Sequence, residues 1–102
     1  GNMNNIMKQA QKMQKQMAET TKALEEKTYE ATAGGGVVSV TVSGKKEVTA
    51  IKIAEEVVDP DDIEMLEDLI MAATNEAFRA MEADSQAQMS KLTGGLGGGF
   101  GF

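Results

Sequence analysis

The chain contains no histidine and no cysteine among its 102 residues. Their absence excludes imidazole and thiolate metal sites, disulfide bonds, haem ligation and catalysis by a cysteine or histidine side chain. Any chemistry must therefore use carboxylates, amines, hydroxyls or the backbone. From this composition we expect neither a metal site nor a cofactor.

Aromatic residues are scarce and make up 4% of the chain. Phe100 and Phe102 lie in a glycine-rich tail, so only Tyr29 and Phe78 remain to anchor a hydrophobic core. A chain of this length with so few large apolar side chains is only marginally stable alone. We therefore expect a partner subunit to complete the core.

Long hydrophobic runs are absent as well. The sequence has no window of about 18 consecutive apolar residues, and no charged-then-apolar leader precedes a small-residue cleavage site. We therefore expect no membrane segment and no export, and a location in the cytoplasm.

The formal net charge is −6 at pH 7, but the charges are unevenly distributed. Residues 1–18 carry three lysines and no acid, whereas residues 55–84 carry eleven acids and a single base, Arg79. A partner responds to the charge of the surface that it approaches, so the net charge does not exclude a polyanion such as nucleic acid.

The first segment, residues 2–27, has no glycine or proline and is rich in good helix formers. Its apolar positions recur in steps of three and four, which is typical of a heptad seam. The seam comprises Met3, Ile6, Ala10, Met13, Met17, Thr20 and Leu24, and the opposite side of the helix carries Lys8, Lys12, Lys15 and Lys22. Such a helix is roughly 39 Å long, more than a domain of this size needs, so we expect part of it to project.

Residues 28–54 change from a helical period to the alternation of β-strands. Val38, Val40 and Val42 alternate with serine and threonine, which indicates a strand with one apolar face. A turn at Gly35–Gly36 would pair this strand with the preceding one, so that Ala33 meets Val38 and Tyr29 meets Val42.

Gly44 and Lys45 predict a two-residue turn into a third strand. That turn would place Thr49 opposite Val40 and Ile51 opposite Val38. The result is a three-stranded antiparallel sheet with one apolar face and an open last edge, where a partner has room to add strands.

The segment Asp59–Pro60 predicts the start of a second long helix, with Asp59 as N-cap and Pro60 at the first helical position. This helix should run to about Lys91 and cover the sheet. Its apolar stripe comprises Ile63, Leu66, Leu69, Ile70, Ala73, Ala77 and Phe78. We therefore expect an α+β fold with a single domain over residues 1–93 and a flexible Gly/Phe-rich tail over residues 94–102.

Three patterns that resemble active or metal sites have simpler explanations. Gly34–Gly36 leads into a strand and not into a helix capped by Lys-Ser/Thr, so it predicts a hairpin and not a phosphate loop. The carboxylates of Asp59, Asp61 and Asp62 lack the glycine and glutamate positions of a calcium loop. Glu55 and the acids that follow lack an apolar pocket, so they indicate a solvated acidic face. We expect no enzyme and no small-molecule substrate.

The four lysines of the first helix are the feature that indicates a function. Lys8 and Lys22 are roughly 21 Å apart along a helix, a span that reaches several phosphates of one duplex. The alternative is an ordinary solvated helix face. The stripe lacks the Arg, Asn and aromatic residues that read or stack on bases, so it predicts contacts with the DNA backbone.

Three stretches together resemble the YbaB/EbfC family of nucleoid-associated proteins. They are MKQAQKMQKQM at 7–17, GGGVVSVTVSG at 34–44 and DPDDIEMLEDLIMAATNEA at 59–77, and the resemblance covers about residues 3–92. It implies a bacterial cytoplasmic protein of the nucleoid that forms a homodimer, in which the sheets and second helices meet and the long helices project like the arms of tweezers. It also implies binding of duplex DNA with little sequence preference and an architectural or regulatory role.

The resemblance and the residue patterns together define the candidate sites. The candidate DNA-binding residues are Lys8, Lys12, Lys15 and Lys22, with Arg79 and Lys91 as contributors. The candidate dimer interface comprises Val38, Val40, Val42, Ile51, Leu66, Leu69, Ile70 and Phe78. The rival hypothesis is a coiled-coil adaptor whose projecting helices clasp a protein partner, and the acidic residues 55–84 favour it because they repel DNA.

Overall fold

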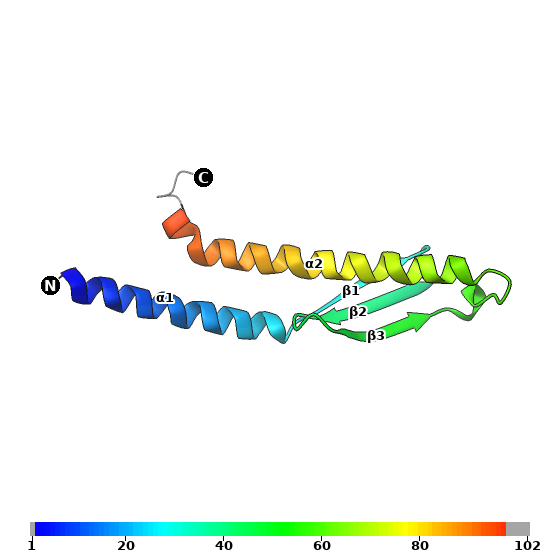
Figure 1. Cartoon of the computed structure of the whole chain (residues 1–102), viewed down its shortest axis with the longest axis horizontal. Helices are drawn as coiled ribbons and strands as arrows, with labels where there is room; N and C mark the ends of the chain where they lie inside the picture. The colour runs from blue at the N-terminus through cyan, green and yellow to red at the C-terminus, as the bar shows by residue number, and fades with distance from the viewer. Residues whose placement is uncertain (1, 98–102) are drawn as a thin grey trace.

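A computed structural model describes residues 2–97 of the chain and the side chains of residues 2–94. One long helix, α2, runs over a three-stranded sheet, and a second, α1, extends away from one end of it (Figure 1). In chain order the elements are α1 (Asn2–Glu25), β1 (Thr28–Ala33), β2 (Val38–Ser43), β3 (Val48–Ile53), the 3₁₀ turn η1 (Glu55–Val57) and α2 (Ile63–Gly97). The predicted α+β class and element order are confirmed.

The far end of α2 differs from its predicted position. The helix continues to Gly97, beyond Lys91, so residues 94–97 are helical and do not belong to a tail. The remaining residues of the predicted tail, 98–102 with Phe100 and Phe102, lie outside the described residues, and their flexibility stays a prediction.

The first hairpin has the predicted register. The sheet order is β1-β2-β3, and Ala33 lies opposite Val38 while Tyr29 lies opposite Val42. Gly34, Gly35 and Gly36 all have positive φ (65°, 74° and 97°), a conformation that favours glycine. The hairpin interpretation of these glycines is therefore confirmed.

The predicted pairing of β2 with β3 is wrong by two residues, because Val40 lies opposite Ile51 and not Thr49. The register shifts next to Val42, whose partner is Val48. Thr49 is the extra residue at this irregularity, so Val48 stays on the same face as Ile51 despite their odd spacing.

Residues 44–47 separate β2 from β3, and the turn closed by Ser43 and Glu47 contains three residues, not the predicted two. Ser43 N donates to Glu47 O at 2.8 Å, and Lys46 has the left-handed conformation (φ 69°) typical of the third residue of such a loop. Gly44 is required for a reason that the local pattern does not contain. A Cβ at Gly44 would overlap the carbonyl oxygen of Leu24 in α1.

The start of α2 also differs from the prediction. The helix begins at Ile63, and Asp62 caps it by accepting a hydrogen bond from Met65 N at 3.2 Å. Asp59 instead closes a turn before the helix, where its carboxylate accepts a hydrogen bond from Asp61 N at 2.9 Å. Four consecutive residues include three possible caps, so the choice among them depends on where the preceding chain leaves the sheet.

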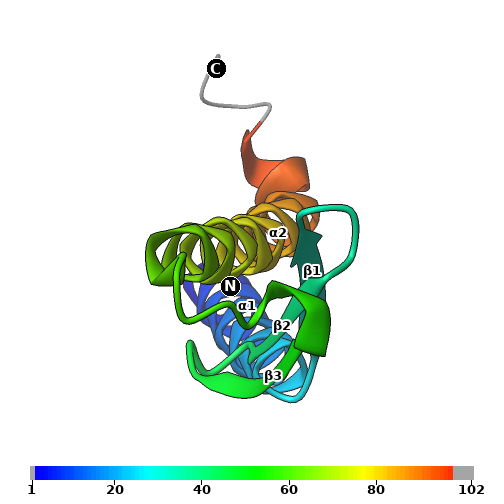
Figure 2. The same cartoon turned by 90° about the vertical axis from the view of Figure 1, so that its right-hand side faces the viewer.

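The core lies between α2 and two of the three strands. Viewed end-on, α2 crosses β1 and β2, whereas β3 lies away from it (Figure 2). The fully buried side chains of β2 pack against the small residues of α2, and the buried core comprises Val38, Val40, Val42, Val57, Ala73, Ala77 and Met81. The predicted apolar face is confirmed, but α2 covers only part of it: Val48, Ile51 and Ile53 of β3 are 44%, 46% and 38% exposed.

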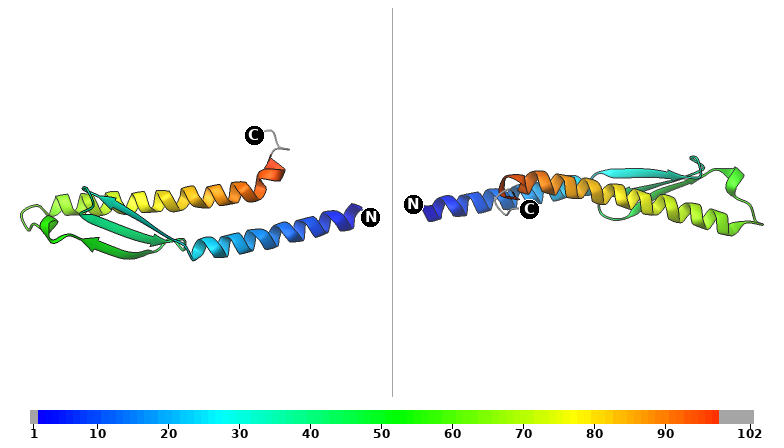
Figure 3. Two further views of the ribbon diagram at one scale, coloured as in Figure 1. Left: turned by 180° about the vertical axis from the view of Figure 1, so that it is seen from behind. Right: turned by 90° about the horizontal axis from the view of Figure 1, so that it is seen from above.

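The two helices continue past the sheet as projections, which we call the arms: residues 2–23 of α1 and 82–97 of α2. They run side by side away from the sheet and bring both chain ends to one end of the molecule (Figure 3). The remainder, the body, comprises the sheet, η1 and the first half of α2. The arms make the molecule elongated, with extents of 73 × 27 × 16 Å.

Candidate nucleic-acid interface

The four predicted lysines of α1 are all exposed. Lys8, Lys12 and Lys15 lie on the α1 arm, and Lys22 lies close to its root. Among the described side chains, none of the four forms an ion pair or a hydrogen bond. Their ammonium groups are therefore available to an anionic partner over most of the length of α1.

The two predicted contributors on α2 have different settings. Arg79 belongs to the half of α2 that covers the sheet, and its Nε lies 3.9 Å from Glu76 Oε2, with both side chains well exposed. Lys91 is exposed on the α2 arm. The structure therefore places Lys91 on the same projecting part of the molecule as the α1 lysines, whereas Arg79 lies on the body.

The predicted heptad seam of α1 is closed only at its root. Leu24 is buried and Met13 is half-buried, but Met3, Ile6 and Met17 are 71%, 60% and 41% exposed. A groove of about 670 Å³ separates the two arms. It is lined by Ile6, Gln9, Ala10, Lys12, Met13, Gln14 and Gln16 from α1 and by Leu92 from α2.

The residues of the candidate dimer interface are of two kinds, those that the chain itself covers and those that it leaves exposed. Val38, Val40 and Val42 have no exposed surface because α2 of the same chain covers them. The residues of α2, namely Leu66, Leu69, Ile70 and Phe78, are partly buried against that core. Ile51 on β3 is the most exposed of these candidates, and it marks the apolar surface that the chain leaves uncovered.

The acidic residues lie mainly at the opposite end of the molecule from the arm tips. Glu55 and Glu56 of η1 and the turn at Asp59–Asp62 precede α2, at the end of Figure 1 away from both termini. Within residues 2–97 no group of acidic side chains is arranged to hold a metal ion. The carboxylates of Asp59 and Asp62 accept backbone hydrogen bonds, Asp59 within a turn and Asp62 as the helix cap.

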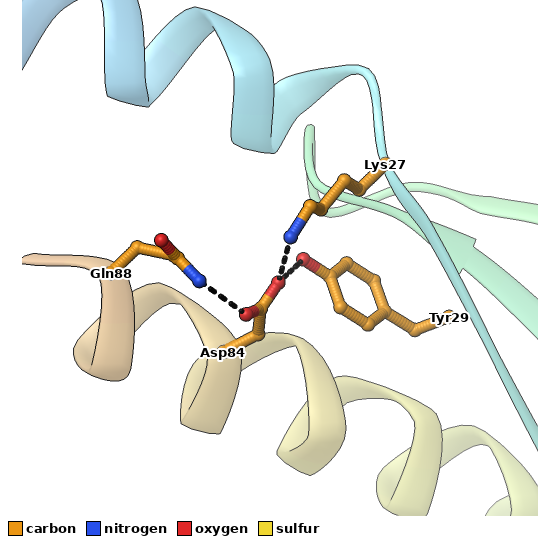
Figure 4. Close-up of polar contacts among 4 residues, drawn as sticks. All are labelled: Lys27, Tyr29, Asp84 and Gln88. Atoms are coloured by element: carbon orange, nitrogen blue, oxygen red, sulfur yellow. Dashed lines mark hydrogen bonds and ion pairs between the residues drawn. The ribbon is translucent and has the colours of Figure 1, made fainter.

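The sequence did not predict one polar cluster. The Asp84 carboxylate on α2 accepts hydrogen bonds from Tyr29 Oη at 2.6 Å, Lys27 Nζ at 2.9 Å and Gln88 Nε2 at 3.3 Å (Figure 4). These donors, led by the Tyr29 hydroxyl, hold the pKa of Asp84 at about 2. Burial, followed by the hydrogen bond to Asp84, raises the pKa of Tyr29 to about 12. No local pattern predicts this cluster, because Asp84 is more than fifty residues from Lys27 and Tyr29.

The sequence profile of the YbaB/EbfC DNA-binding family matches residues 1–96. The chain belongs to this family. YbaB/EbfC proteins form a DNA-binding family and not a family of enzymes, in agreement with the expectation from the residues.

Curated relatives are named nucleoid-associated proteins, and a solved structure has the same fold. The chain is 73% identical over 99 residues to a nucleoid-associated protein of Agathobacter rectalis, and the aligned region covers 97% of this chain and 88% of the relative. It is 69% identical over 103 residues to a nucleoid-associated protein of Lachnoclostridium phytofermentans, and the aligned region covers 99% of this chain and 87% of that relative. The fold matches the crystal structure of the uncharacterized protein HP0035 of Helicobacter pylori, with a TM-score of 0.73, 21% identity, and coverage of 85% and 91%. Within residues 2–97, neither helix has a stretch apolar and long enough to cross a membrane.

Proposed function

We propose that the protein is a homodimeric, architectural or regulatory protein of the nucleoid that binds the backbone of duplex DNA through Lys8, Lys12, Lys15 and Lys22. The observation that carries the proposal is the unpaired, exposed row of lysines along α1 in a chain of a DNA-binding family. Relatives from two bacteria are named nucleoid-associated proteins, which supports a role in the nucleoid and hence in the cytoplasm.

The chemistry of the row favours contacts with phosphates. Ammonium groups bind phosphates as point charges and release condensed counterions, so their contribution is independent of sequence. The row contains no arginine or aromatic residue to read base edges or to stack on bases. The protein should therefore bind duplex DNA with little preference for its base sequence.

The homodimer is supported by the surface that α2 leaves uncovered. Val48, Ile51 and Ile53 form an exposed apolar strip on the core side of β3, which is also the open edge of the sheet. Exposed Ile63 at the start of α2 adds apolar surface to the same body. A second copy that covered β3 would bury this strip and complete a core that is small for a stable chain. It would also bring a second pair of arms, and so double the number of lysines.

The direct test of function is a titration of a labelled duplex with the parent protein and a charge-reversal variant. Replacing Lys8, Lys12 and Lys15 by glutamate should abolish binding at moderate salt, because the arm would repel phosphates. Folding should survive, because these positions are exposed and unpaired. The matched control reverses Lys45, Lys46 and Lys52 of the β2–β3 hairpin, which changes the net charge equally and should retain far more affinity.

The second candidate function is the adaptor that clasps a protein partner. The observation that favours it is the open groove between the arms, whose apolar lining includes Ile6, Met13 and Leu92. The same titration decides between the two. If the arm variant remains dimeric and binds duplex as tightly as the parent, the lysines only solubilise the arm and do not carry DNA binding. If the parent itself binds no duplex, the adaptor function replaces DNA binding.

A further inference from the structure

The two arms leave the body at the same level. Leu24 is the only buried residue of α1, and Met81 is the last buried residue of α2 within the described side chains. Both line a cavity of about 280 Å³, together with Tyr29, Gly44, Lys46, Glu82, Ser85 and Gln86. Beyond this level no described residue of either arm is buried, and the facing residues Met13, Met89 and Leu92 are only half-buried.

The root of α1 is tied firmly to the sheet. Gly44 N donates to Lys27 O at 2.9 Å, and Lys27 N donates to Leu24 O at 3.1 Å where the helix ends. Gly44 also packs directly against the Leu24 carbonyl, where no side chain would fit. The backbone therefore fixes the point from which α1 departs, but it does not connect α1 to α2.

Asp84 supplies that connection. It follows Met81 by one helical turn, and its carboxylate accepts hydrogen bonds from Lys27, in the two-residue link between α1 and β1, and from Tyr29, at the start of β1 (Figure 4). Gln88, one turn further along α2, holds the second carboxylate oxygen at 3.3 Å. Among the described side chains, no other hydrogen bond or ion pair joins α2 to α1 or to the sheet.

The hydrogen bonds around Asp84 are well suited to fix the angle between α1 and α2. The carboxylate receives an ammonium and a phenol on one oxygen and an amide on the other, and charge-assisted bonds of this kind are stronger than neutral ones. The side chain of Asp84 is 24% exposed, so solvent competes with these donors less than at an open surface. Three donors, one each from the α1–β1 link, β1 and α2 itself, leave the carboxylate little freedom to rotate.

We infer that Asp84 is a positioning residue that sets the angle between the α1 and α2 arms, through Lys27 and Tyr29, and thereby the position of the α1 lysine row relative to Lys91 and to the body. The effect of that position on DNA binding rests on the proposed function. An α1 of 24 residues is about 36 Å long, so a change of about 10° at its root moves its tip by about 6 Å. That displacement exceeds the rise of about 3.4 Å per phosphate of one strand along the duplex axis.

The arm angle is measurable without DNA. The chain has no cysteine, so Gln11→Cys and Ser90→Cys introduce one spin label on each arm at exposed positions. Labelled chains are mixed with an excess of unlabelled chains, so that the distances come from one subunit. The parent should give a narrow distance distribution, and Asp84→Ala should broaden it or shift it by several ångströms.

We call the hydrogen-bonded cluster of Asp84 with Lys27, Tyr29 and Gln88 the clamp. Matched variants distinguish loss of the clamp from general damage to α2. Glu82→Ala removes a neighbouring exposed carboxylate with no hydrogen-bond partner among the described residues, and it should leave the distribution unchanged. Tyr29→Phe removes one donor and keeps the ring, so it should broaden the distribution less than Asp84→Ala. Asp84→Asn keeps an acceptor oxygen without the charge and should be intermediate. If Asp84→Ala does not fold, Tyr29→Phe carries the test.

The duplex titration tests the functional part. Asp84→Ala should bind several-fold more weakly than Glu82→Ala, although both remove one negative charge. A distance distribution unaffected by Asp84→Ala and Tyr29→Phe would overturn the clamp, whether or not DNA binds. A changed distribution with equal affinities for the two variants would overturn the positioning role. A parent that binds no duplex would refute the proposed function and leave the distance measurement valid.

Discussion

At the scale of single residues, a few side chains act through contacts that are distant in sequence. Gly44 is needed because the last turn of α1 passes over it, not because of its own turn conformation. The Tyr29–Asp84 pair joins the start of the sheet to the arm of α2. Both effects depend on how the elements are packed, and each can be isolated by a single substitution.

Replacing Gly44 by alanine should lower the free energy of unfolding by about 1–3 kcal/mol, because the added methyl group overlaps the Leu24 carbonyl and the root of α1 must move. Urea unfolding at one fixed protein concentration measures the change. The control is Gly94→Ala in α2, where a Cβ meets nothing within 4 Å and alanine favours the helix. Equal effects of the two substitutions would mean that α1 does not approach Gly44 closely.

Tyr29 is the only tyrosine in the chain, so phenolate absorbance reports on it alone. Its titration midpoint should lie near pH 12 in the parent. In Asp84→Ala the midpoint should fall toward 10 but stay above it, because burial remains the larger cause of the raised pKa. A parent midpoint near 10 would show that Tyr29 is neither buried nor bonded to Asp84.

The same two pKa values define the pH window of the clamp. The folded-state pKa of Asp84 is lowered, so its contribution is complete above the unfolded value of about 4 and is lost as the pH falls toward 2. The folded-state pKa of Tyr29 is raised, so its contribution is complete below about 10 and is lost as the pH rises toward 12. The distance between the labelled arms should therefore be constant between about pH 5 and pH 9.

At the scale of elements, α2 decides which part of the sheet is core. It covers β1 and β2 along their apolar face and leaves β3 aside, although the apolar pattern continues through all three strands. Alternation in the sequence predicts one apolar face, but it does not predict where a single helix crosses that face. The uncovered strip on β3 is a consequence of this offset, and the proposed dimer depends on it.

Ile51→Glu should convert the proposed dimer into a monomer, because it places a charge in the centre of the strip that a second copy would cover. The monomer should keep its helical content, because Ile51 is already 46% exposed within one chain. Light scattering should give a mass near the 10.8 kDa of one chain. Lys52→Glu, on the other face of β3, is the control and should remain dimeric. A dimeric Ile51→Glu would exclude this strip as the interface.

At the scale of the whole molecule, the charges are separated along an axis of 73 Å. Four of the nine lysines lie along α1, and half of the 16 acids lie in residues 55–68, around η1 and the start of α2 at the other end. DNA should therefore approach the arms and avoid the acidic end of the body, even though the net charge is −6.

The salt dependence of duplex binding tests this separation. If Lys8, Lys12, Lys15 and Lys22 of both subunits meet phosphates, the logarithm of affinity should fall with the logarithm of salt at a slope of at most about −7. Replacing Lys15 by glutamine should make the slope shallower by about one to two, since two contacts are lost per dimer. Exchanging base pairs in the duplex should change affinity much less. A slope near zero would contradict binding to the backbone.

The sequence by itself determined the element order, the register of the first hairpin and the lysine row on α1, because each depends on local periodicity and on glycines with positive φ. The apolar alternation of the strands also predicted which face of the sheet turns inward, whereas the heptad seam of α1 is buried only at Leu24. The limits of α2 at Ile63 and Gly97 were less predictable, since several caps compete and helix ends depend on their surroundings.

Only the tertiary structure decided the pairing of β3, the role of Gly44, the open groove between the arms and the cluster at Asp84. Each of these depends on contact between segments far apart in the chain: Leu24 with Gly44, Lys27 with Asp84, and α2 with two strands rather than three. The residues involved have no periodicity that marks them, because their partners are chosen by how the two helices cross the sheet. Periodicity predicts which face of an element is apolar, whereas packing decides what that face meets.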